Sequence, residues 1–325
     1  MLVARTPEDV SQGAGVALTL GTFDGVHRGH RKIIQRTVDA ARAANGRSVL
    51  LTFDPHPREV IGRRGDPTYL LTTMDERMAL LADTGLDACI VLPFTRDLSM
   101  LDAETFFEEY IVRKLHARHV VVGIDHAFGR GRSGSAPALQ AFGAARGVDV
   151  TVVGEMLLDG IKVSSTAIRN ALTEGRVRQA TRFLGRPYTM SGLVTRGERI
   201  GSSIGFPTAN LELSAENKLL PKNGVYIVAV QIGDEIHEGI MNIGRRPTVS
   251  KQVHISVEVH IFITSGDLYG RRMHIALLDR LRDEIRFENR EQLSAQIRTD
   301  ITYAKELLAK NNEEYNKEQF KFPKE

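Results

Sequence analysis

VALTLGTFDGVHRGHRKII, residues 16–34, leads from an apolar run into an amphipathic helix. The run VALTL is short and β-type, whereas RKIIQRTVDAARAANG carries apolar residues at three-to-four spacing. Between them, glycines, an aspartate and the pair His27 and His30 crowd the junction. A plain strand-to-helix connection needs only a turn and a cap, so the two histidines indicate a binding site.

The same alternation continues through the first half of the chain. The apolar runs SVLLTF, ACIVLPF, HVVVG and VDVTVVG alternate with helical stretches, several of which stop at a glycine (Gly46, Gly85 and Gly147). Strand–helix alternation implies parallel strands with right-handed crossovers. We therefore expect an α/β domain with a Rossmann-like open parallel sheet, which binds ligands at the carboxyl ends of its strands.

The second half has a different pattern. GVYIVAVQIG, HEGIMNIG, HISVEVHIF and RMHIALL are β-type runs with no long helix between them, and REQLSAQIRTDITYAKELLAK is a terminal helical stretch. This pattern predicts a small antiparallel β-barrel with a terminal helix. We place the domain boundary near Arg186, which gives domains at residues 1–185 and 186–325, with a polar tail that we expect to fray.

Composition narrows the class of protein. The chain has 325 residues, of which 42% are hydrophobic, and this suits two globular domains. Its net charge is only +3, so neither nucleic acid nor a membrane is an expected partner. The single cysteine, Cys89, excludes an internal disulfide and a cysteine zinc cage. Without a long apolar run or a secretion signal, we expect a cytoplasmic protein.

The histidine pair suits a phosphate. A helix N-terminus offers unpaired N–H groups and a positive dipole end, and Gly29 allows close approach to the backbone. His27 precedes the helix and His30 lies in its first turn, so both rings can converge on one anion and donate hydrogen bonds to it. The alternative is one histidine acting as a cap and the other exposed to solvent.

GTFDGVHRGH resembles the His-x-Gly-His motif of the nucleotidyltransferase superfamily. More narrowly, it resembles the first motif of the prokaryotic bifunctional riboflavin kinase/FMN adenylyltransferases, also called FAD synthetases. VSSTAIRNAL is similar to the motif that this superfamily uses on ATP, and its hydroxyls can cap a helix with Arg169 one turn later. The resemblance implies catalytic roles for His27, His30 and Arg169. It implies ATP contacts for six further residues: Gly21, Phe23, Gly29, Ser164, Ser165 and Thr166.

Two further stretches follow apolar strands of the first half: TFDPHP, residues 52–57, and GIDHAFGRGRSG, residues 123–134. The resemblance assigns them to the flavin and nucleotide pocket, with contacts from His56, Asp125 and Phe128. Many relatives carry Phe-Arg where this chain has His126 and Ala127. From the residues alone, His56 between two prolines is equally consistent with a rigid turn.

GSSIGFPTANLEL, residues 201–213, carries the second candidate site. Its glycines Gly201 and Gly205 flank amides that can wrap a phosphate. Thr208 and Asn210 lie on the same side of an extended segment, and their oxygens suit Mg²⁺. The alternative is a plain glycine-rich turn, but GFPTAN closely resembles the riboflavin kinase motif. That family often carries arginine where this chain has Ser202.

HISVEVHIF alternates strictly, so Ile255, Val257, Val259 and Ile261 are predicted to face the core. Glu258 is on the other face, where a solvated carboxylate is the ordinary state. The resemblance instead makes Glu258 the kinase base, since that base stands in a similar Glu-x-His context. We interpret His254 and His260 as surface residues rather than as a metal pair.

The resemblance covers the chain from about residue 16 to residue 308, and MNIGRRPT and GDLYG also match the kinase family. It implies ATP-dependent phosphorylation of riboflavin to FMN, then adenylylation of FMN by ATP to FAD and pyrophosphate. The expected cofactor is Mg²⁺, with ATP as co-substrate, in a monomer or weak homo-oligomer. The alternatives are a kinase with a degenerate N-terminal half, a non-catalytic flavin or nucleotide sensor, and a nucleic-acid binder.

Overall fold

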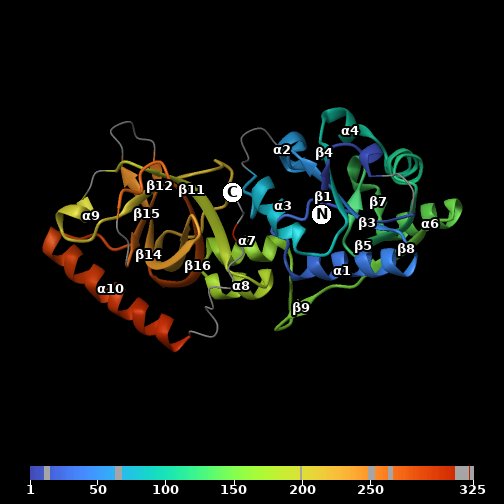
Figure 1. Ribbon diagram of the computed structural model, residues 1–325. Coiled ribbons are helices and arrows are strands. Elements are labelled where there is room, and N and C mark those ends of the chain that lie inside the picture. The colour runs from blue at the N-terminus through green and yellow to red at the C-terminus, as the bar shows by residue number, and fades with distance from the viewer. Residues whose placement is uncertain are drawn as a thin grey trace. The chain divides into compact units, whose positions relative to one another are not determined.

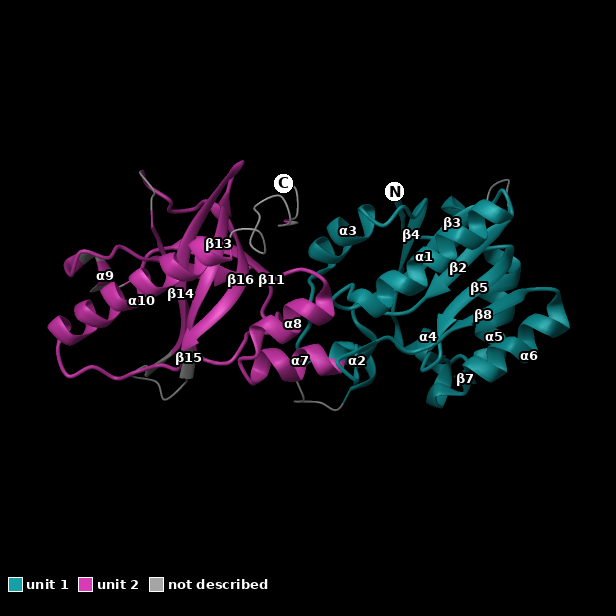
Figure 2. Ribbon diagram, turned by 90° about the horizontal axis from the view of Figure 1, so that it is seen from below, with its two compact units in different colours: residues 1–165, 323–325 teal, residues 166–322 magenta. Residues whose placement is uncertain are grey.

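The computed structural model describes residues 1–10, 15–62, 68–197, 200–247, 253–262, 266–311 and 322. The chain forms two compact units, which divide after Ser165 (Figure 2). The second unit begins at Thr166 and therefore includes helix α8 (Val177–Leu184) and most of helix α7 (Ser165–Thr173). The expected domain boundary after residue 185 stays a prediction.

The first unit contains a parallel six-stranded sheet, which confirms the Rossmann-like expectation (Figure 1). In spatial order its strands are β1 (Leu2–Ala4), β4 (Ala88–Pro93), β3 (Arg47–Asp54), β2 (Val16–Leu20), β5 (Ala117–Gly123) and β8 (Asp149–Val153). The strand order reverses at β2, whose neighbours are β3 and β5. The crevice outside the carboxyl ends of such strands is the usual ligand site.

Helices cover both faces of this sheet, because its strands are apolar on both sides. On one face, α1 (Arg28–Ala43) and α3 (Met74–Ala82) pack Ile34 and Leu81 against Leu50 and Val91. On the other face lie α5 (Ala103–Phe106), η2 (Phe107–Lys114) and α6 (Ala136–Arg146). The stretch AETFFEEYIVRKL, residues 103–115, thus forms a short α-helix continued by a π-helix.

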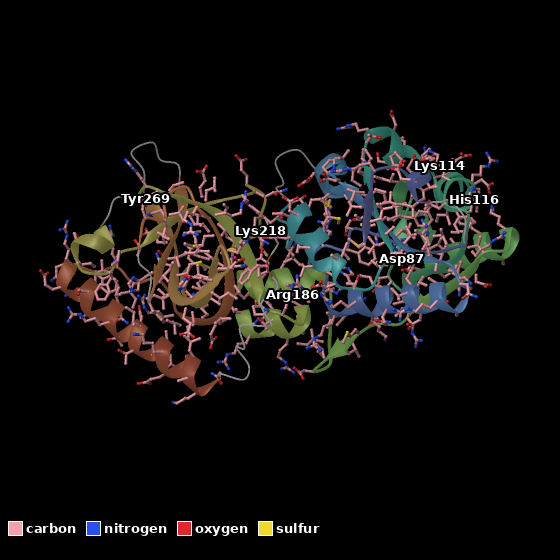
Figure 3. The ribbon with its side chains drawn as sticks, in the orientation of Figure 1. Asp87, Lys114, His116, Arg186, Lys218 and Tyr269 are labelled. Atoms are coloured by element: carbon pink, nitrogen blue, oxygen red, sulfur yellow. The ribbon has the colours of Figure 1, made fainter. Side chains whose placement is uncertain are left out.

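Shorter elements complete the first unit. They are η1 (Pro7–Asp9), α2 (Pro57–Ile61), α4 (Arg96–Met100), β6 (Ala127–Phe128), η3 (Arg130–Arg132), β7 (Gly134–Ser135), β9 (Leu157–Leu158) and β10 (Ile161–Lys162). The strands β6 and β7 pair with each other, as do β9 and β10. Asp87, labelled in Figure 3, accepts hydrogen bonds from the N–H and hydroxyl groups of Ser48 and so ties the loop before β4 to β3.

The second unit contains a closed six-stranded barrel, as the sequence predicts. Around the barrel the strands are β11 (Tyr188–Thr195), β12 (Ala209–Leu213), β15 (Val253–Ile261), β14 (Glu235–Pro247), β13 (Gly224–Ile232) and β16 (Arg272–Arg282). A four-residue helix, α9 (Ile200–Ser203), precedes β12, and the terminal helix α10 (Arg290–Lys310) lies along the outside of the barrel (Figure 1).

The barrel strands have one apolar face inside and another under α10. Ile227 and Ile240 pack with Ala304 and Leu308 of the helix. Residues at the alternate positions of these strands face the other way. Among them, Met241 and Val259 pair with each other and are fully buried. This alternation positions the polar residues of β15 on the helix side of the ladder.

One residue of the predicted inward row of β15 departs from expectation. Val257, Val259 and Ile261 are buried, but Ile255 is 49% exposed. Ile255 pairs with Arg245 near the end of the β14–β15 ladder, where strand alternation no longer guarantees a covering layer.

Candidate active sites

His27 forms the N-cap of helix α1. Its backbone is extended (φ −73°, ψ 172°), and its Nδ1 atom accepts the backbone N–H of His30 at 3.2 Å. The ring is buried and thus takes the place of the serine or aspartate that usually fills this position. The first turn of the helix, residues 28–31, is basic rather than acidic, so its dipole end stays available to an anion.

The two imidazoles of the motif are in direct contact. The rings of His27 and His30 stack with centroids 3.5 Å apart and planes 16° apart. The ring of Phe23 lies 4.9 Å from that of His30 on a tilted plane. The structure therefore brings three of the predicted site residues together at the carboxyl end of β2.

The glycines of this loop make room for aromatic rings. A methyl group on Gly29 would lie 3.2 Å from Cε1 and Nδ1 of His27, and one on Gly21 would lie 3.4 Å from the Phe23 ring. Gly21 also has a φ of +153°, which disfavours other residues. The glycine that the sequence suggests for ligand approach at position 29 thus has a packing role beside His27.

Ser165 connects the second motif to the first. Its hydroxyl donates to the backbone carbonyl of Asp24 at 2.9 Å, and it is the first residue of α7. Ser164 directly precedes α7, and Thr166, on the helix, is exposed. Arg169 belongs to the second unit, so its predicted role beside the histidines stays a prediction.

The predicted flavin contacts come from two segments of the first unit, the cap of α2 and the stretch of residues 123–134. His56 caps α2, where its Nδ1 atom accepts the N–H of Arg58, and is only 8% exposed. Asp125 is exposed and ion-paired with Lys162, which also binds Glu155 at 2.7 Å. Phe128 packs edge-on against the core residue Phe106 at 5.5 Å. Their flavin-binding roles stay predictions.

His126, where the chain departs from its relatives, lies within the stretch of residues 123–134. Its ring stacks on that of Phe128 with centroids 5.7 Å apart. Burial, together with the smaller effect of the nearby Arg132, lowers the pKa of His126 to about 4. His126 is therefore a neutral side chain near pH 7.

The second candidate site is a cavity of about 500 Å³ in the barrel unit. Four predicted residues line it: Gly201, Thr208, Asn210 and Glu258. Gly205 does not appear among the described residues of its lining, although its φ of +87° suits the turn before the strand. The side chain of Ser202 lies outside the described part of the chain, as does that of His254.

Strand pairing aligns the polar groups of this cavity. Asn210 of β12 and Asn242 of β14 both pair with Glu258, which lies between them on β15. Directly paired residues share a face of the sheet, so these three side chains form a row across three strands. The Thr208 hydroxyl reaches Oε2 of Glu258 at 3.4 Å, which places a hydroxyl, an amide and a carboxylate together.

Asn210 is packed against the chain that precedes α9. A methyl group on Gly197 would lie 2.0 Å from its Nδ2 atom, a distance at which one of the two must move. Gly201 is similarly enclosed, because a methyl group there would lie 2.3 Å from the carbonyl oxygen of Phe206. Gly201 is thus required for space beside the backbone, whereas a side chain at position 197 would have to displace the Asn210 amide.

The other side of the cavity is apolar and ends at a buried ion pair. The apolar lining residues are Ile204, Phe206, Val225, Ile240, Met241, Ile285, Phe287, Leu293 and Ile297. Arg282 of β16 binds both carboxylate oxygens of Asp300 of α10, at 2.7 to 3.1 Å. Gln296 donates to the same carboxylate at 2.9 Å. The ion pair fixes α10 over the cavity.

His260 is not the surface residue that we expected. It lines the cavity, and its Nδ1 atom lies 2.8 Å from the carbonyl oxygen of Pro207. It shares a strand face with Glu258, two residues away, so the alternation of HISVEVHIF contained this signal. Asn242, within the quoted motif MNIGRRPT, was likewise identifiable by its pattern, whereas Arg282 and Asp300 carry no such signal.

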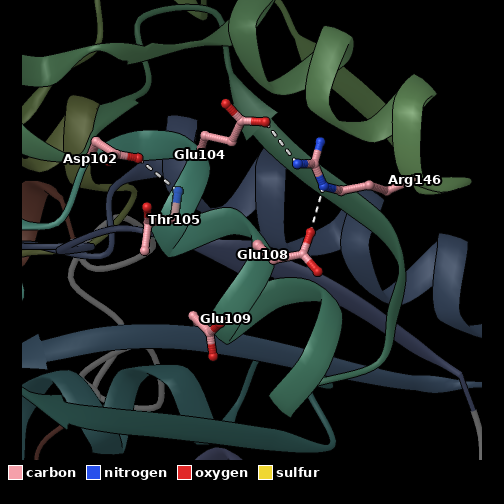
Figure 4. Close-up of a pocket in the computed structure, with 6 residues that line it drawn as sticks. All are labelled: Asp102, Glu104, Thr105, Glu108, Glu109 and Arg146. Atoms are coloured by element: carbon pink, nitrogen blue, oxygen red, sulfur yellow. Dashed lines mark hydrogen bonds and ion pairs between the residues drawn. The ribbon is translucent and has the colours of Figure 1, made fainter.

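A further hollow of about 380 Å³ lies on the first unit (Figure 4). Arg146 bridges Glu104 and Glu108 across it, at 2.8 and 2.6 Å. Its described lining contains none of the candidate site residues, and its carboxylates are engaged by arginine or by helix capping. It is a surface ion-pair network.

Family models match both halves of the chain. The FAD synthetase family model matches residues 9–167, which contain the histidine pair. The riboflavin kinase family model matches residues 184–308, which contain Thr208, Asn210 and Glu258. The fold and the two sites thus define a two-domain enzyme of flavin cofactor synthesis.

Relatives cover most of the chain. The bifunctional riboflavin kinase/FMN adenylyltransferase of Escherichia coli K12 is 37% identical over 95% of this chain and 98% of its own length. The Listeria monocytogenes enzyme of the same name is 36% identical over 90% and 92%. The chain belongs to the family of bifunctional riboflavin kinase/FMN adenylyltransferases.

A solved structure has the same fold. A chain from Streptococcus pneumoniae described as a macrolide-efflux protein has a TM-score of 0.85 and 29% identity, covering 94% of this chain and 98% of that one. The description concerns that protein, and the likeness is one of fold. Within the described residues of the present chain, no helix is long and apolar enough to cross a membrane.

Proposed function

We propose that this chain phosphorylates riboflavin to FMN in its barrel unit and adenylylates FMN to FAD in its parallel-sheet unit. The observation that carries the proposal is the row of Asn210, Glu258 and Asn242 beside the Thr208 hydroxyl, in one cavity of about 500 Å³. A sensor that only binds flavin does not need a carboxylate held at such a place. The sensor alternative is therefore less well supported. The presence of His27, His30 and Arg169 argues against a kinase with a degenerate first unit.

In the kinase reaction, Glu258 accepts the proton of the ribityl hydroxyl as the hydroxyl oxygen attacks the γ-phosphorus of ATP. ADP is the leaving group. The Thr208 hydroxyl, 3.4 Å from the Glu258 carboxylate, orients that base. The apolar wall of the cavity suits the flavin ring system, and Gly201 presents backbone to the phosphates.

The same cavity suits Mg²⁺. Its polar side offers the hydroxyl of Thr208, the amide oxygen of Asn210 and the carboxylate of Glu258, which are hard oxygen donors. We assign Thr208 and Asn210 to the metal and Glu258 to the substrate hydroxyl. When bound, the ion neutralises charge that builds up on the phosphate oxygens.

In the adenylylation reaction, a phosphate oxygen of FMN attacks the α-phosphorus of ATP and pyrophosphate leaves. FMN is already an anion, so the reaction depends on alignment and charge stabilisation rather than on a strong base. The stacked His27 and His30 donate to the triphosphate at the N-terminus of α1, and Arg169 supplies a guanidinium. Ser164, Ser165 and Thr166 add hydroxyl and amide donors, and His56, Asp125 and Phe128 contact the flavin.

Chromatography of the products tests both assignments in one experiment. The purified full chain is incubated with ATP, Mg²⁺ and either riboflavin or FMN, beside the variants His30→Ala and Glu258→Gln. Wild type is expected to make FAD from both flavins, His30→Ala to stop at FMN, and Glu258→Gln to make FAD only from FMN. Glu212→Gln, an exposed carboxylate on β12, is the matched control and should behave as wild type.

Each of the other possible results would refute a particular part of the proposal. A wild-type protein that stops at FMN would mean a degenerate first unit. Loss of neither activity in the two site variants would overturn the residue assignments, and the absence of any flavin product would leave a binding role. Gel filtration of the same sample tests the proposed monomer or weak homo-oligomer, and fractionation of the producing cells tests the proposed cytoplasmic location.

A further inference from the structure

A buried ion pair joins helix α3 to the loop of residues 21–27, which we call the histidine loop. The side chain of Arg77, on helix α3, is 2% exposed, and that of Asp24, within the loop, is 1% exposed. Burying an arginine and an aspartate together is costly unless both are held by good partners. Neither residue has a role in the two proposed reactions, so the pair calls for a separate explanation.

Asp24 joins the histidine loop to the segment before α3 through a network of hydrogen bonds, which we call the clamp. Its carboxylate accepts the backbone N–H groups of Leu71 and Thr72 at 2.9 to 3.0 Å, and the Thr72 hydroxyl at 3.1 Å. The Thr72 hydroxyl in turn accepts the N–H of Gly25 at 3.0 Å. One threonine therefore binds both the side chain of Asp24 and the backbone that follows it.

Arg77 contacts both residues of this clamp, Asp24 and Thr72. Its Nη2 atom lies 3.8 Å from Oδ1 of Asp24 and 3.4 Å from the carbonyl oxygen of Thr72, and its Nε donates to the Thr72 hydroxyl at 3.5 Å. Burial lowers the pKa of Arg77, and the Asp24 carboxylate opposes that shift. The guanidinium thus neutralises Asp24 and holds the threonine at the same time.

The clamped loop has a conformation that it would not adopt alone. Phe23 has a φ of +48° and Val26 a φ of +38°, both in the left-handed region that β-branched and bulky residues avoid. Such strain persists only where the surroundings impose the conformation. The residues on either side of Asp24 and Gly25 are therefore strained where the clamp attaches.

The loop is connected to the proposed site residues at two points. Val26 leads directly to His27, the cap of α1 that stacks on His30. The backbone carbonyl of Asp24 accepts the hydroxyl of Ser165, at the start of α7. Movement of Asp24 would thus displace the histidine loop and disturb the hydrogen bond to Ser165.

We propose that Thr72 and Arg77 are positioning residues for FMN adenylylation, which hold Asp24 and through it the strained histidine loop in its working geometry. The inference rests on the proposed role of His27 and His30. It assigns a reaction-specific role to residues that do not touch substrate.

The test uses the full chain, with adenylylation of FMN, phosphorylation of riboflavin and hydrogen exchange of the peptide covering residues 21–31 as three readouts. Thr72→Val removes the hydroxyl and keeps the shape, and Thr72→Ser keeps the hydroxyl. Thr37→Val is the matched control: Thr37 is also fully buried in the first unit, with its hydroxyl bonded to the Ile33 carbonyl of its own helix. Arg77→Met removes the guanidinium.

We expect Thr72→Val and Arg77→Met to lower kcat for FAD formation tenfold or more, since displacement by about 1 Å can cost a hundredfold. The KM values should change little, kinase activity should stay at the wild-type level, and exchange in residues 21–31 should rise. Thr72→Ser should restore both activity and protection. Thr37→Val should alter neither.

Equal effects of Thr72→Val and Thr37→Val, or wild-type FAD formation by Thr72→Val, would overturn the proposal. If Arg77→Met fails to fold, the comparison of Thr72→Val with Thr72→Ser decides. His30→Ala in the same assay separates the two levels of inference. Full FAD formation by His30→Ala would refute the histidine assignment, whereas unchanged exchange in Thr72→Val would refute the clamp itself.

Discussion

His27 and His30 contact each other twice: their rings stack with centroids 3.5 Å apart, and the Nδ1 atom of His27 accepts the backbone N–H of His30. Because Nδ1 is an acceptor, neutral His27 carries its proton on Nε2. The helix cap thus fixes the tautomer of the ring, and Nε2 becomes the atom that donates to a phosphate oxygen in the proposed reaction.

The capping role of His27 can be separated from its proposed catalytic role by mutation. Asparagine is among the best N-caps, so His27→Asn should keep α1 stable and lose only the imidazole. We expect the rate of FAD formation from FMN to fall about 100- to 1,000-fold, the loss typical of one missing transition-state donor. The rate of riboflavin phosphorylation and the urea midpoint should stay near wild type. A large fall in stability with full FAD formation would instead assign His27 to structure alone.

Gly197→Ala should impair the kinase without changing the chemistry of any proposed catalytic group. Its added methyl group would lie 2.0 Å from Nδ2 of Asn210, so the amide must leave its place beside the cavity. We expect at least a tenfold loss of FMN formation and a higher Mg²⁺ concentration for half-maximal rate. Gly154→Ala is the control, because a methyl group there meets no atom within 4 Å. Unchanged Mg²⁺ dependence would argue against Asn210 as a ligand.

The ion pair between Arg282 and Asp300 should contribute far more than a surface pair. Asp300→Asn leaves Arg282, only 18% exposed, without its charge partner. We expect a loss of about 2–4 kcal/mol in the urea unfolding of the barrel unit, accompanied by weaker riboflavin binding. Glu109→Gln breaks the exposed pair with Arg113 and should cost less than about 1 kcal/mol. Similar losses in the two variants would contradict a structural role for the buried pair.

His126 should make stability depend on pH. Burial lowers its pKa from 6.5 to about 4, so between these values the unfolded chain binds a proton that the folded chain does not. Stability is therefore lost as the pH falls through this window and is retained above it. His126→Phe should remove this contribution, so the difference in unfolding free energy between wild type and variant should shift by about 2 kcal/mol in favour of the variant between pH 7 and pH 5, measured by urea unfolding. A pH-independent difference would mean that the folded state accommodates the protonated ring.

Much of the fold follows from local patterns. The alternation of apolar runs and amphipathic helices predicts the parallel sheet, and the run of β-type segments predicts the barrel. Strand β1 was missed because it has three residues, Leu2–Ala4, and exists only through pairing with β4, more than eighty positions away. No periodicity can reveal a strand this short.

The residues at the candidate sites also fall into two groups, those that sequence motifs identify and those that only the tertiary structure brings together. Motif residues such as His27, Thr208 and Glu258 can be found from the sequence because their neighbours identify them. Arg77 could not, because DERMALLADTG is typical of a surface helix, and only the packing of α3 buries that arginine. Arg282 and Asp300 lie 18 positions apart on different elements, and their pairing is a product of tertiary structure.

Alternate residues of strand β15 belong to the barrel core and to the candidate site. Val257 and Val259 belong to the barrel interior, while Glu258 between them faces the cavity. A single inserted or deleted residue upstream in this strand would exchange the two sets, placing the carboxylate in the barrel interior and a valine on the cavity side. The length of this strand is therefore under the same constraint as the identity of its glutamate, and we expect natural variants of the barrel to differ in their loops before they differ in the spacing along β15.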